Sequence, residues 1–213
     1  MAVSSQRRGD YRGDVLRVAV IGGIGSGKTA VTDYLAERGA GVVDADVVAR
    51  SVVEVGRPAW QQLRDAFGDG VLAPDRTLDR ALVAEIVFND PSALRRLNRI
   101  THGAIGIEIV AQLEALGPRD LAVIALPLYR KEHREIFKLD EVWCVDAPVD
   151  VAIARLTGPR ALSEADARAR IAAQPTNDER LAVADVALHN AGTLEDLHRR
   201  IDEILDERGL LRG

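Results

Sequence analysis

The chain has 213 residues, 47% hydrophobic and 29% charged, a composition typical of a globular protein that can bury a full core. Its formal net charge of −5 and its pI near 5.5 argue against a broad basic face, so nucleic acid is not an expected partner. A single cysteine excludes a disulfide framework. Without a long apolar segment or a signal peptide, the expected location is the cytoplasm, with no membrane partner.

Residues 1–14 are polar and basic, with three arginines and two glycines among them. Such a segment buries too little apolar surface to offset the entropy lost on ordering, so we predict a disordered leader. A phosphate-binding arm is the alternative interpretation of the same arginines.

A glycine-rich loop joins the first predicted strand to the first predicted helix. Residues 15–21 are apolar and β-branched, which predicts a buried parallel strand, and residues 29–38 have a helical pattern that stops at Gly39. Between them, residues 22–29 spell GGIGSGKT and match the phosphate-binding P-loop, G-x-x-x-x-G-K-[ST]. In this context backbone N–H groups and the helix N-terminus converge on a phosphate chain.

The P-loop predicts a site for a nucleoside triphosphate with Mg²⁺. Lys28 would reach the terminal phosphates as a point charge, and the hydroxyl group of Thr29 would hold the metal. The residues expected to bind the nucleotide are Gly23, Ile24, Gly25, Ser26, Gly27, Lys28, Thr29 and Ala30.

Two other interpretations of the loop compete with this one. A glycine-rich turn can be only a tight connection between a strand and a helix. In addition, Gly25, Gly27 and Ala30 fit the dinucleotide fingerprint G-x-G-x-x-G/A, and Asp44 lies near the end of the next strand, where a ribose-binding acid would be. Lys28 favours the P-loop, because a Rossmann turn needs no lysine beside the pyrophosphate.

Strand-like segments alternate with helical patterns along the chain. The strand-like segments are residues 15–21, 41–45, 121–126, 141–146 and 183–189. The alternation predicts an α/β fold in which a five-stranded parallel sheet is flanked by helices, as in P-loop kinases, with a helical substrate-binding insertion and a helical lid. Cys144 lies in the apolar fourth segment, so we expect it to fill the core rather than to act as a catalytic thiol.

Two helical excursions interrupt the alternation. The first contains helical patterns at 58–67, 78–88 and 91–116, and the second, 148–181, carries several arginines. A small-molecule kinase needs such parts, because an insertion can hold the acceptor while a lid closes over the phosphates and excludes water.

The predicted division of the chain follows from these excursions. The nucleotide-binding core comprises residues 15–50, 118–156 and 180–213, the acceptor-binding insertion residues 51–117, and the lid residues 157–179. A last helix, 193–208, is expected to begin with Thr193 as its N-cap. Its expected packing stripe contains Leu194, Leu197, Ile201, Ile204 and Leu205.

Charged residues near the ends of the predicted strands are candidates for chemistry. Asp44 and Asp46 follow the second strand, and in open α/β sheets the ligand crevice lies at that edge. Phosphoryl transfer to an alcohol needs a group that accepts the hydroxyl proton; we expect Asp46 to do so and Asp44 to cap the next helix. Arg155 and Arg160 follow the fourth strand and would cover negative charge on the transferred group.

A set of short motifs runs in order over nearly the whole chain. They are residues 22–29, 43–50, 67–68, 78–80, 86–88, 127–128, 155–156, 170–174 and 184–185, with His102 and Asn190. Together they resemble the dephospho-CoA kinase family. Many nucleotide-binding proteins share the P-loop, but its combination with Asp-Ala-Asp-x-x-Ala-Arg at 44–50 and Arg-Ile-x-x-Gln at 170–174 is specific.

The resemblance implies ATP and Mg²⁺ as the donor system and the ribose 3′-hydroxyl group of dephospho-CoA as the acceptor. It implies Asp46 as the base, with Lys28 and Arg155 at the phosphates. Arg160 would be a nucleotide-binding residue of the lid, and the insertion would carry the acceptor. These small molecules are the expected partners, and the protein is expected to be a monomer or a weak homo-oligomer.

Two departures from the family pattern point to alternative functions. Ala125 stands where the family commonly has an aspartate that would orient Mg²⁺ or its waters, so one alternative is a nucleotide- or CoA-binding homologue with little catalysis. Tyr129, Arg130 and Lys131 replace the family's Leu-x-Glu, so the other alternative is a kinase of a different small-molecule hydroxyl group.

Overall fold

The computed structural model describes residues 15–158 and 162–210, and its contacts divide the chain into two compact units. One, the sheet unit, comprises Met1–Val43 and Leu116–Gly213; the other, the helical unit, comprises Asp44–Ala115. The predicted leader, residues 1–14, and Arg160 lie outside the described residues. Within the described part, no helix combines the length and the apolar character needed to cross a membrane.

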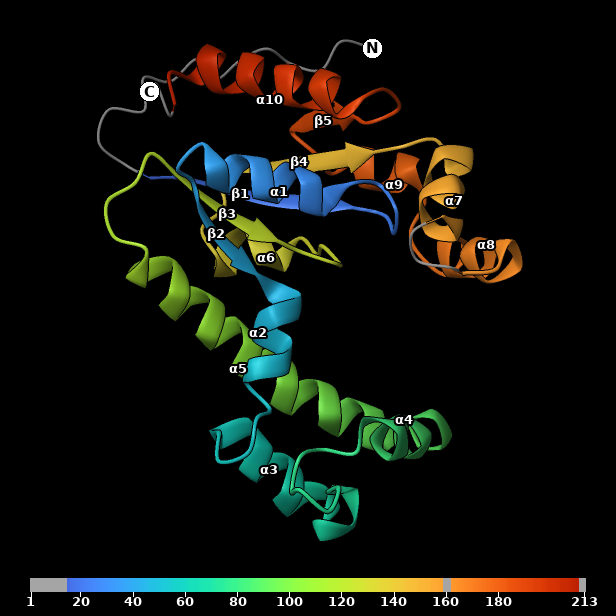
Figure 1. Ribbon diagram of the computed structural model, residues 1–213. Helices are drawn as coiled ribbons and strands as arrows, with labels where there is room; N and C mark the ends of the chain where they lie inside the picture. Colours follow the sequence, from blue (N-terminus) through green and yellow to red (C-terminus); the bar gives the residue numbers. More distant parts are fainter. Residues whose placement is uncertain (1–14, 159–161, 211–213) are drawn as a thin grey trace. The chain divides into compact units, whose positions relative to one another are not determined.

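A five-stranded parallel sheet forms the centre of the sheet unit (Figure 1). Its strands are β1 Leu16–Gly22, β2 Gly41–Asp44, β3 Leu121–Ala125, β4 Glu141–Asp146 and β5 Val186–His189. The order is β2-β3-β1-β4-β5, so β1 lies between β3 and β4. The register pairs Val20 with Ala125 and Gly22 with Val145, which brings the carboxyl ends of these three strands to one edge. The predicted fold class is confirmed.

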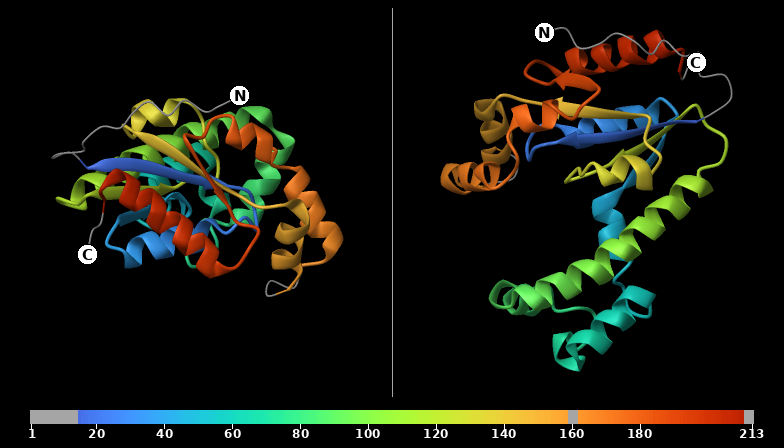
Figure 2. Two further views of the ribbon diagram at one scale, coloured as in Figure 1. Left: turned by 90° about the horizontal axis from the view of Figure 1, so that it is seen from above. Right: turned by 180° about the vertical axis from the view of Figure 1, so that it is seen from behind.

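Two helices, α1 Lys28–Glu37 and α10 Leu194–Arg208, cover the same face of this sheet (Figures 1 and 2). Alternate residues of β1 point into the core beneath them, and Leu16, Val18 and Val20 are completely buried there. Full burial of such a side chain contributes about 1.5–3 kcal/mol each. The strand that leads into the P-loop is therefore among the most firmly held parts of the unit.

The sheet unit has four further described helices, which are α6 Glu132–Ile136, α7 Val149–Thr157, α8 Glu164–Ala172 and α9 Asn177–Leu181. Helices α7 and α8 lie beyond the carboxyl ends of the strands, whereas α6 lies alongside the sheet (Figure 1). The arginine-rich excursion between β4 and β5 forms α7, α8 and α9, at the same end of the sheet as the P-loop.

Helix α10 begins as the sequence predicts. Thr193 and Asp196 form a capping box, in which each side chain accepts the backbone N–H of the other residue. The predicted packing stripe is confirmed at four positions, which are Leu197, Ile201, Ile204 and Leu205. It is wrong for Leu194, whose side chain is 51% exposed, because the first residue after the cap faces solvent.

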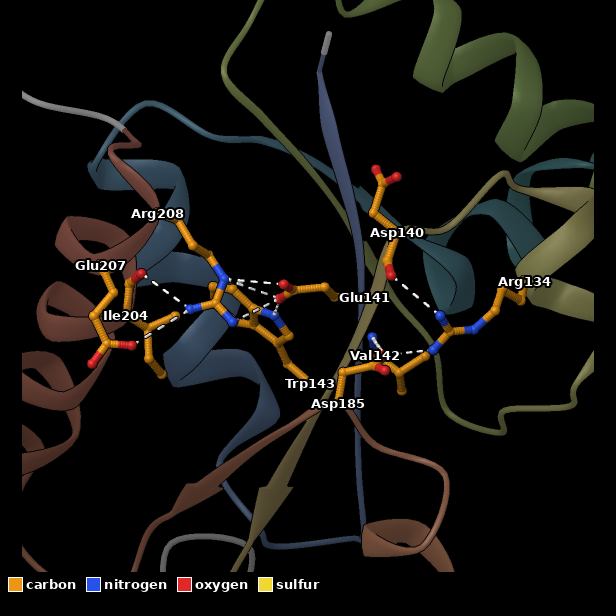
Figure 3. A network of polar contacts seen from close by, with 9 residues as sticks. All are labelled: Arg134, Asp140, Glu141, Val142, Trp143, Asp185, Ile204, Glu207 and Arg208. Carbon is orange, nitrogen blue, oxygen red and sulfur yellow. Dashed lines mark hydrogen bonds and ion pairs between the residues drawn. The ribbon is translucent and has the colours of Figure 1, made fainter. Parts of the chain in front are cut away.

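The amino end of β4 is joined to α10 by an arginine and a glutamate that are both largely buried (Figure 3). Arg208 Nε donates to both carboxylate oxygens of Glu141 at 3.1 Å, and Trp143 Nε1 donates to Glu141 Oε2 at 2.6 Å. The guanidinium carbon of Arg208 also lies 5.7 Å from the ring centroid of Trp143. One carboxylate thus satisfies two buried donors at once.

A second polar cluster beside it explains where β5 begins (Figure 3). The carboxylate of Asp185 accepts the backbone N–H of Val142 at 2.7 Å and pairs with Arg134. Arg134 Nη1 also donates to the carbonyl oxygen of Asp140 at 3.2 Å. The predicted strand 183–189 is therefore wrong at its start, because the strand begins at residue 186. Residues 183–185 belong to the preceding turn, which positions the carboxylate of Asp185.

We expect Glu141→Ala to lower the free energy of unfolding by about 2–4 kcal/mol, because it leaves the buried Arg208 and Trp143 without their acceptor. The exposed pair of Arg200 and Glu203 on α10 provides a matched control. Glu203→Ala should cost less than about 1 kcal/mol. Urea denaturation followed by circular dichroism measures both, and equal losses would contradict this account of the cluster.

Cys144 lies in the middle of β4 and is buried, so its predicted place in the core is confirmed. Burial, together with the negative charge of the nearby Asp146, raises the pKa of its thiol to about 11. At a pH near 8, we expect the native protein to react with a disulfide reagent at least about 100-fold more slowly than the unfolded protein. Comparable rates in the presence and absence of urea would show that the thiol is accessible.

The helical unit consists of four helices and a short 3₁₀ turn. They are α2 Ala45–Ser51, α3 Pro58–Phe67, the turn Asp69–Val71, α4 Arg80–Asn89 and α5 Pro91–Ala115. The first, second and third of these helices pack against the long helix α5 (Figure 2). The predicted start of α4 at residue 78 is wrong, because Asp79 caps the helix by accepting the N–H groups of Ala81 and Leu82 at 3.1 and 3.0 Å.

Candidate active site

The P-loop joins β1 to α1, and its backbone requires glycine at two positions. Gly25 and Gly27 have φ angles of 76° and 101°, which glycine alone adopts readily. A Cβ atom on Gly27 would lie 2.1 Å from Asn190 Nδ2, and one on Gly25 would lie 2.8 Å from the carbonyl oxygen of Ala152. Neighbouring elements therefore pack directly on the loop backbone, where no side chain fits.

Arg155 and Asn190 bind the carbonyl side of the loop. Arg155 Nη1 donates to the carbonyl oxygens of Ser26 and Gly25 at 3.2 and 3.4 Å, and Asn190 Nδ2 donates to that of Ser26 at 2.7 Å. Arg155 Nη2 also donates to Asn190 Oδ1 at 3.0 Å, which ties the two side chains together. Arg155 comes from α7 and Asn190 follows β5, so two elements beyond the loop set its conformation.

This arrangement fixes the direction of the loop amides. In a trans peptide the N–H points opposite to the preceding C=O. Because the carbonyl of Ser26 points at Arg155 and Asn190, the N–H of Gly27 points to the other side of the loop, at the N-terminus of α1. An anion at a helix N-terminus is stabilised by such N–H groups and by the helix dipole.

Three side chains of the P-loop take different positions. Lys28 folds back across the loop, and its Nζ donates to the carbonyl oxygen of Gly22 at 3.3 Å. Thr29, in the first turn of α1, is exposed. Ser26 is 97% buried (relative exposure 3%), and its Oγ has no hydrogen-bond partner among the described residues. The loop thus carries one cation, one exposed hydroxyl and one enclosed hydroxyl.

A pocket of about 460 Å³ opens beside the start of the loop. The end of β1, the segment after β3, and the segment from Ala173 to Val183 line it. Its cationic lining residues are Arg130, Lys131 and Arg180. The segment Tyr129–Lys131, which departs from the family pattern, therefore lines the same pocket as the start of the P-loop, at the carboxyl edge of the sheet.

The residues beside the loop fit a magnesium ion that arrives with a triphosphate. Thr29 offers an exposed hydroxyl at the start of α1, whereas Ala125, at the end of β3, offers only a buried methyl group. Among the described residues, no group of three or more histidine, cysteine, aspartate or glutamate side chains could hold a metal. Mg²⁺ usually keeps several waters and takes ligands from substrate phosphates, so the exposed hydroxyl group of Thr29 is compatible with such an ion.

Asp44 and Asp46 lie at the start of the helical unit and differ in what their carboxylates do. Asp44 caps α2, since its Oδ1 accepts the backbone N–H groups of Asp46 and Val47 at 2.7 and 3.3 Å. This cap also ends β2, so the predicted strand residue 45 belongs to the helix. Asp46 is exposed in the first turn, and its carboxylate makes no hydrogen bond or ion pair within the described residues. Asp44 therefore has a structural task, as predicted, and Asp46 is available for chemistry.

Sequence reasoning assigned no role to three residues beside the loop, namely Asn190, Gln174 and Arg180. Asn190 and Gln174 each bind the loop backbone, at Ser26 and Ile24. Both belong to the motifs that carry the family resemblance, which was the one signal available for them. Arg160, expected to bind the nucleotide, lies outside the described residues.

Comparison with known proteins identifies close relatives over most of the chain. The family model for dephospho-CoA kinase matches residues 16–196. The dephospho-CoA kinase of Thermobifida fusca (strain YX) is 42% identical over 193 residues, which cover 91% of this chain and 96% of the relative. That of Corynebacterium jeikeium (strain K411) is 47% identical over 191 residues, which cover 88% and 97%.

Solved structures show the same architecture. TT1252 from Thermus thermophilus matches with a TM-score of 0.76 at 29% identity and covers 93% of this chain and 99% of that protein. The dephospho-CoA kinase from Campylobacter jejuni matches with a TM-score of 0.66 at 22% identity and covers 90% and 96%, a level that shows a shared fold.

Proposed function

The chain belongs to the dephospho-CoA kinase family, and we propose that it transfers the γ-phosphoryl group of ATP to the ribose 3′-hydroxyl group of dephospho-CoA. The family match over both units carries this conclusion, because it includes the P-loop, the segment around Asp46 and the Gln174 motif. The geometry of the P-loop supports it, since the loop carbonyls are bound from one side and an amide faces the other.

The proposed step needs one base and several cations. The oxygen of the acceptor hydroxyl attacks the γ-phosphorus, the bond from that phosphorus to the β–γ bridging oxygen breaks, and ADP leaves with the electron pair. Asp46 accepts the hydroxyl proton, which typically accelerates such a step by about 10²–10⁴-fold. Lys28 meets the charge on the terminal phosphates, while Arg155 holds the loop and supports the same charge.

The remaining roles follow from the position of each residue in the sequence. Backbone groups of Gly23 to Ala30 bind the nucleotide phosphates, and Arg160 binds them from the lid, residues 157–179. Thr29 would hold Mg²⁺, which neutralises charge on the phosphates when it is bound. Residues 51–117 would bind the acceptor.

A coupled assay of ADP release, with and without dephospho-CoA, tests the proposed function. We expect ADP release to require dephospho-CoA and to produce coenzyme A in equal amount, as mass spectrometry of the product would show. The assay also compares acceptors, because Tyr129, Arg130 and Lys131 line the pocket beside the loop. Faster ADP release with another ribose- or polyol-containing acceptor would show that this acceptor, and not dephospho-CoA, is the substrate. ATP binding without turnover on any acceptor would show that the protein is not a kinase.

A further inference from the structure

The guanidinium group of Arg180, in α9, lies against the start of the P-loop. Its Nη1, Cζ and Nη2 atoms lie 3.1, 3.3 and 3.3 Å from the position that a Cβ atom on Gly23 would take. On the residue before, the carbonyl oxygen of Gly22 receives the Nζ donor of Lys28 at 3.3 Å. Two cationic side chains therefore reach consecutive residues of the loop. Because a P-loop lysine contacts the β- and γ-phosphates, Arg180 would be close to the terminal phosphates of a bound nucleotide as well.

The positive charge of Arg180 has no carboxylate partner within 4 Å among the described residues. Its hydrogen-bond acceptors are two neutral amide oxygens, Gln174 Oε1 at 3.1 Å and Asn177 Oδ1 at 3.2 Å. Burial lowers the pKa of Arg180, and the surrounding groups, Glu179 among them, only partly offset this effect. A partly buried charge with no carboxylate at ion-pair distance is costly, and such groups are common where a protein binds an anion.

Two donors converge on a single oxygen at this place. Gln174 Oε1 accepts the backbone N–H of Ile24 at 2.9 Å and Nη2 of Arg180 at 3.1 Å. A P-loop amide and a guanidinium group are both donors that bind phosphate oxygens strongly. Here they bind a neutral carbonyl oxygen, which a charged phosphoryl oxygen can replace without any change in the donors.

We propose that Arg180 is a further catalytic residue, which donates to a non-bridging oxygen of the phosphoryl group during transfer, at the position that Gln174 Oε1 occupies in the free protein. This inference rests on the proposed kinase function. The transition state of phosphoryl transfer spreads charge over the three equatorial oxygens, so a donor there lowers the barrier more than it strengthens nucleotide binding. Gln174 is then a positioning residue that holds both donors in place until the nucleotide displaces it.

A purely structural role for Arg180 predicts different behaviour. In that case the residue would only join α9 to Gln174, and its removal would lower stability and weaken ATP binding together. A catalytic role predicts a large loss in kcat with little change in nucleotide binding, because the contact is made in the transition state. The two roles are therefore separated by kinetics and by binding of a transition-state analogue.

The kinetic test compares Arg180→Ala and Arg180→Lys with the wild-type protein. We expect kcat to fall by about 10²-fold or more in Arg180→Ala, with KM for ATP within about threefold of the wild-type value. Added guanidinium ion should restore part of the activity of Arg180→Ala. Arg168→Ala is the matched control, because Arg168 is exposed on α8 and pairs with Glu164; its kcat should stay within about twofold.

The binding test uses ADP with aluminium fluoride, which mimics the phosphoryl group in transfer, in the presence of the acceptor. We expect Arg180→Ala to bind ADP alone as the wild-type protein does, and to bind the fluoroaluminate complex at least about 10-fold more weakly. Equal affinity for the complex, together with kcat within about threefold of wild type, would overturn the proposal.

The test also covers a variant that does not fold and a different preferred acceptor. If Arg180→Ala does not fold, Arg180→Lys carries the comparison, because it retains the charge and the aliphatic stem but loses the planar fork. A loss in kcat of about 10-fold would support the proposal, and unchanged kcat would reject it. If the wild-type protein prefers another acceptor to dephospho-CoA, the proposed function fails, and the same variants are measured with that acceptor.

Discussion

Lys28→Met is expected to lower kcat by about 10³-fold, because it removes the P-loop cation that we propose meets the charge on the terminal phosphates. The substitution keeps most of the aliphatic stem and removes the ammonium group. In the free protein that group donates to the carbonyl oxygen of Gly22 at 3.3 Å, so it lies close to the start of the loop before any nucleotide binds. The measurement is steady-state ADP release at saturating ATP and acceptor.

Lys138→Met is the matched control for this substitution. Lys138 is exposed in the turn after α6 and has a φ angle of 52°. Both lysine and methionine carry a Cβ atom, so backbone strain at this position does not change. We expect kcat within about twofold of the wild-type value for Lys138→Met. A Lys28→Met protein with wild-type turnover would show that the loop is not the site of transfer.

The P-loop could be predicted because everything that defines it is local. Eight consecutive residues carry the motif, the preceding strand is apolar, and the following helix has its own periodicity. The structure adds that Gly25 and Gly27 have positive φ angles and that neighbouring elements pack directly on their backbone. Spacing alone indicates a binding loop, whereas the packing shows why no other residue type fits.

The side chains that shape the loop could not be predicted in the same way. Arg155 is 129 residues from Ser26, and Asn190 is 164 residues from it. Gln174 is 150 residues from Ile24, to which it binds. Such contacts depend on the order of strands in the sheet and on the path of α7 to α9, and neither is encoded in local periodicity. Sequence reasoning therefore assigned Arg155 to the phosphates, and no local pattern indicated its contacts with the loop carbonyls.

Errors at the ends of predicted elements have a common physical cause. Asp44, Asp79 and Asp185 each use a side-chain oxygen to bind a backbone N–H group, and each ends or delays the element that the apolar pattern predicts. Short polar side chains compete with the backbone for hydrogen bonds in this way. Hydrophobic periodicity locates the buried part of an element, and such residues determine its first or last turn.

Asp46→Asn is expected to lower kcat by about 10²–10⁴-fold, since an amide cannot accept the proton of the acceptor hydroxyl. Asparagine is nearly the same size and is tolerated in the first turn of a helix, so the fold should not change. KM for ATP should change little, because the lost interaction belongs to the chemical step. Burst and steady-state measurements of coenzyme A formation would show whether the chemical step has become slow.

Asp44→Asn is the decisive comparison, because the two aspartates are two residues apart and differ in their surroundings. The Oδ1 of Asp44 accepts the N–H groups of Asp46 and Val47, and asparagine caps a helix about as well as aspartate does. We therefore expect Asp44→Asn to keep kcat within about threefold of the wild-type value, whereas Asp46→Asn loses most of it. If both variants lost activity equally, the proton acceptor would not be Asp46 alone. If only Asp44→Asn lost activity, the assignment would be reversed, and Asp44 would have to leave its capping position for catalysis.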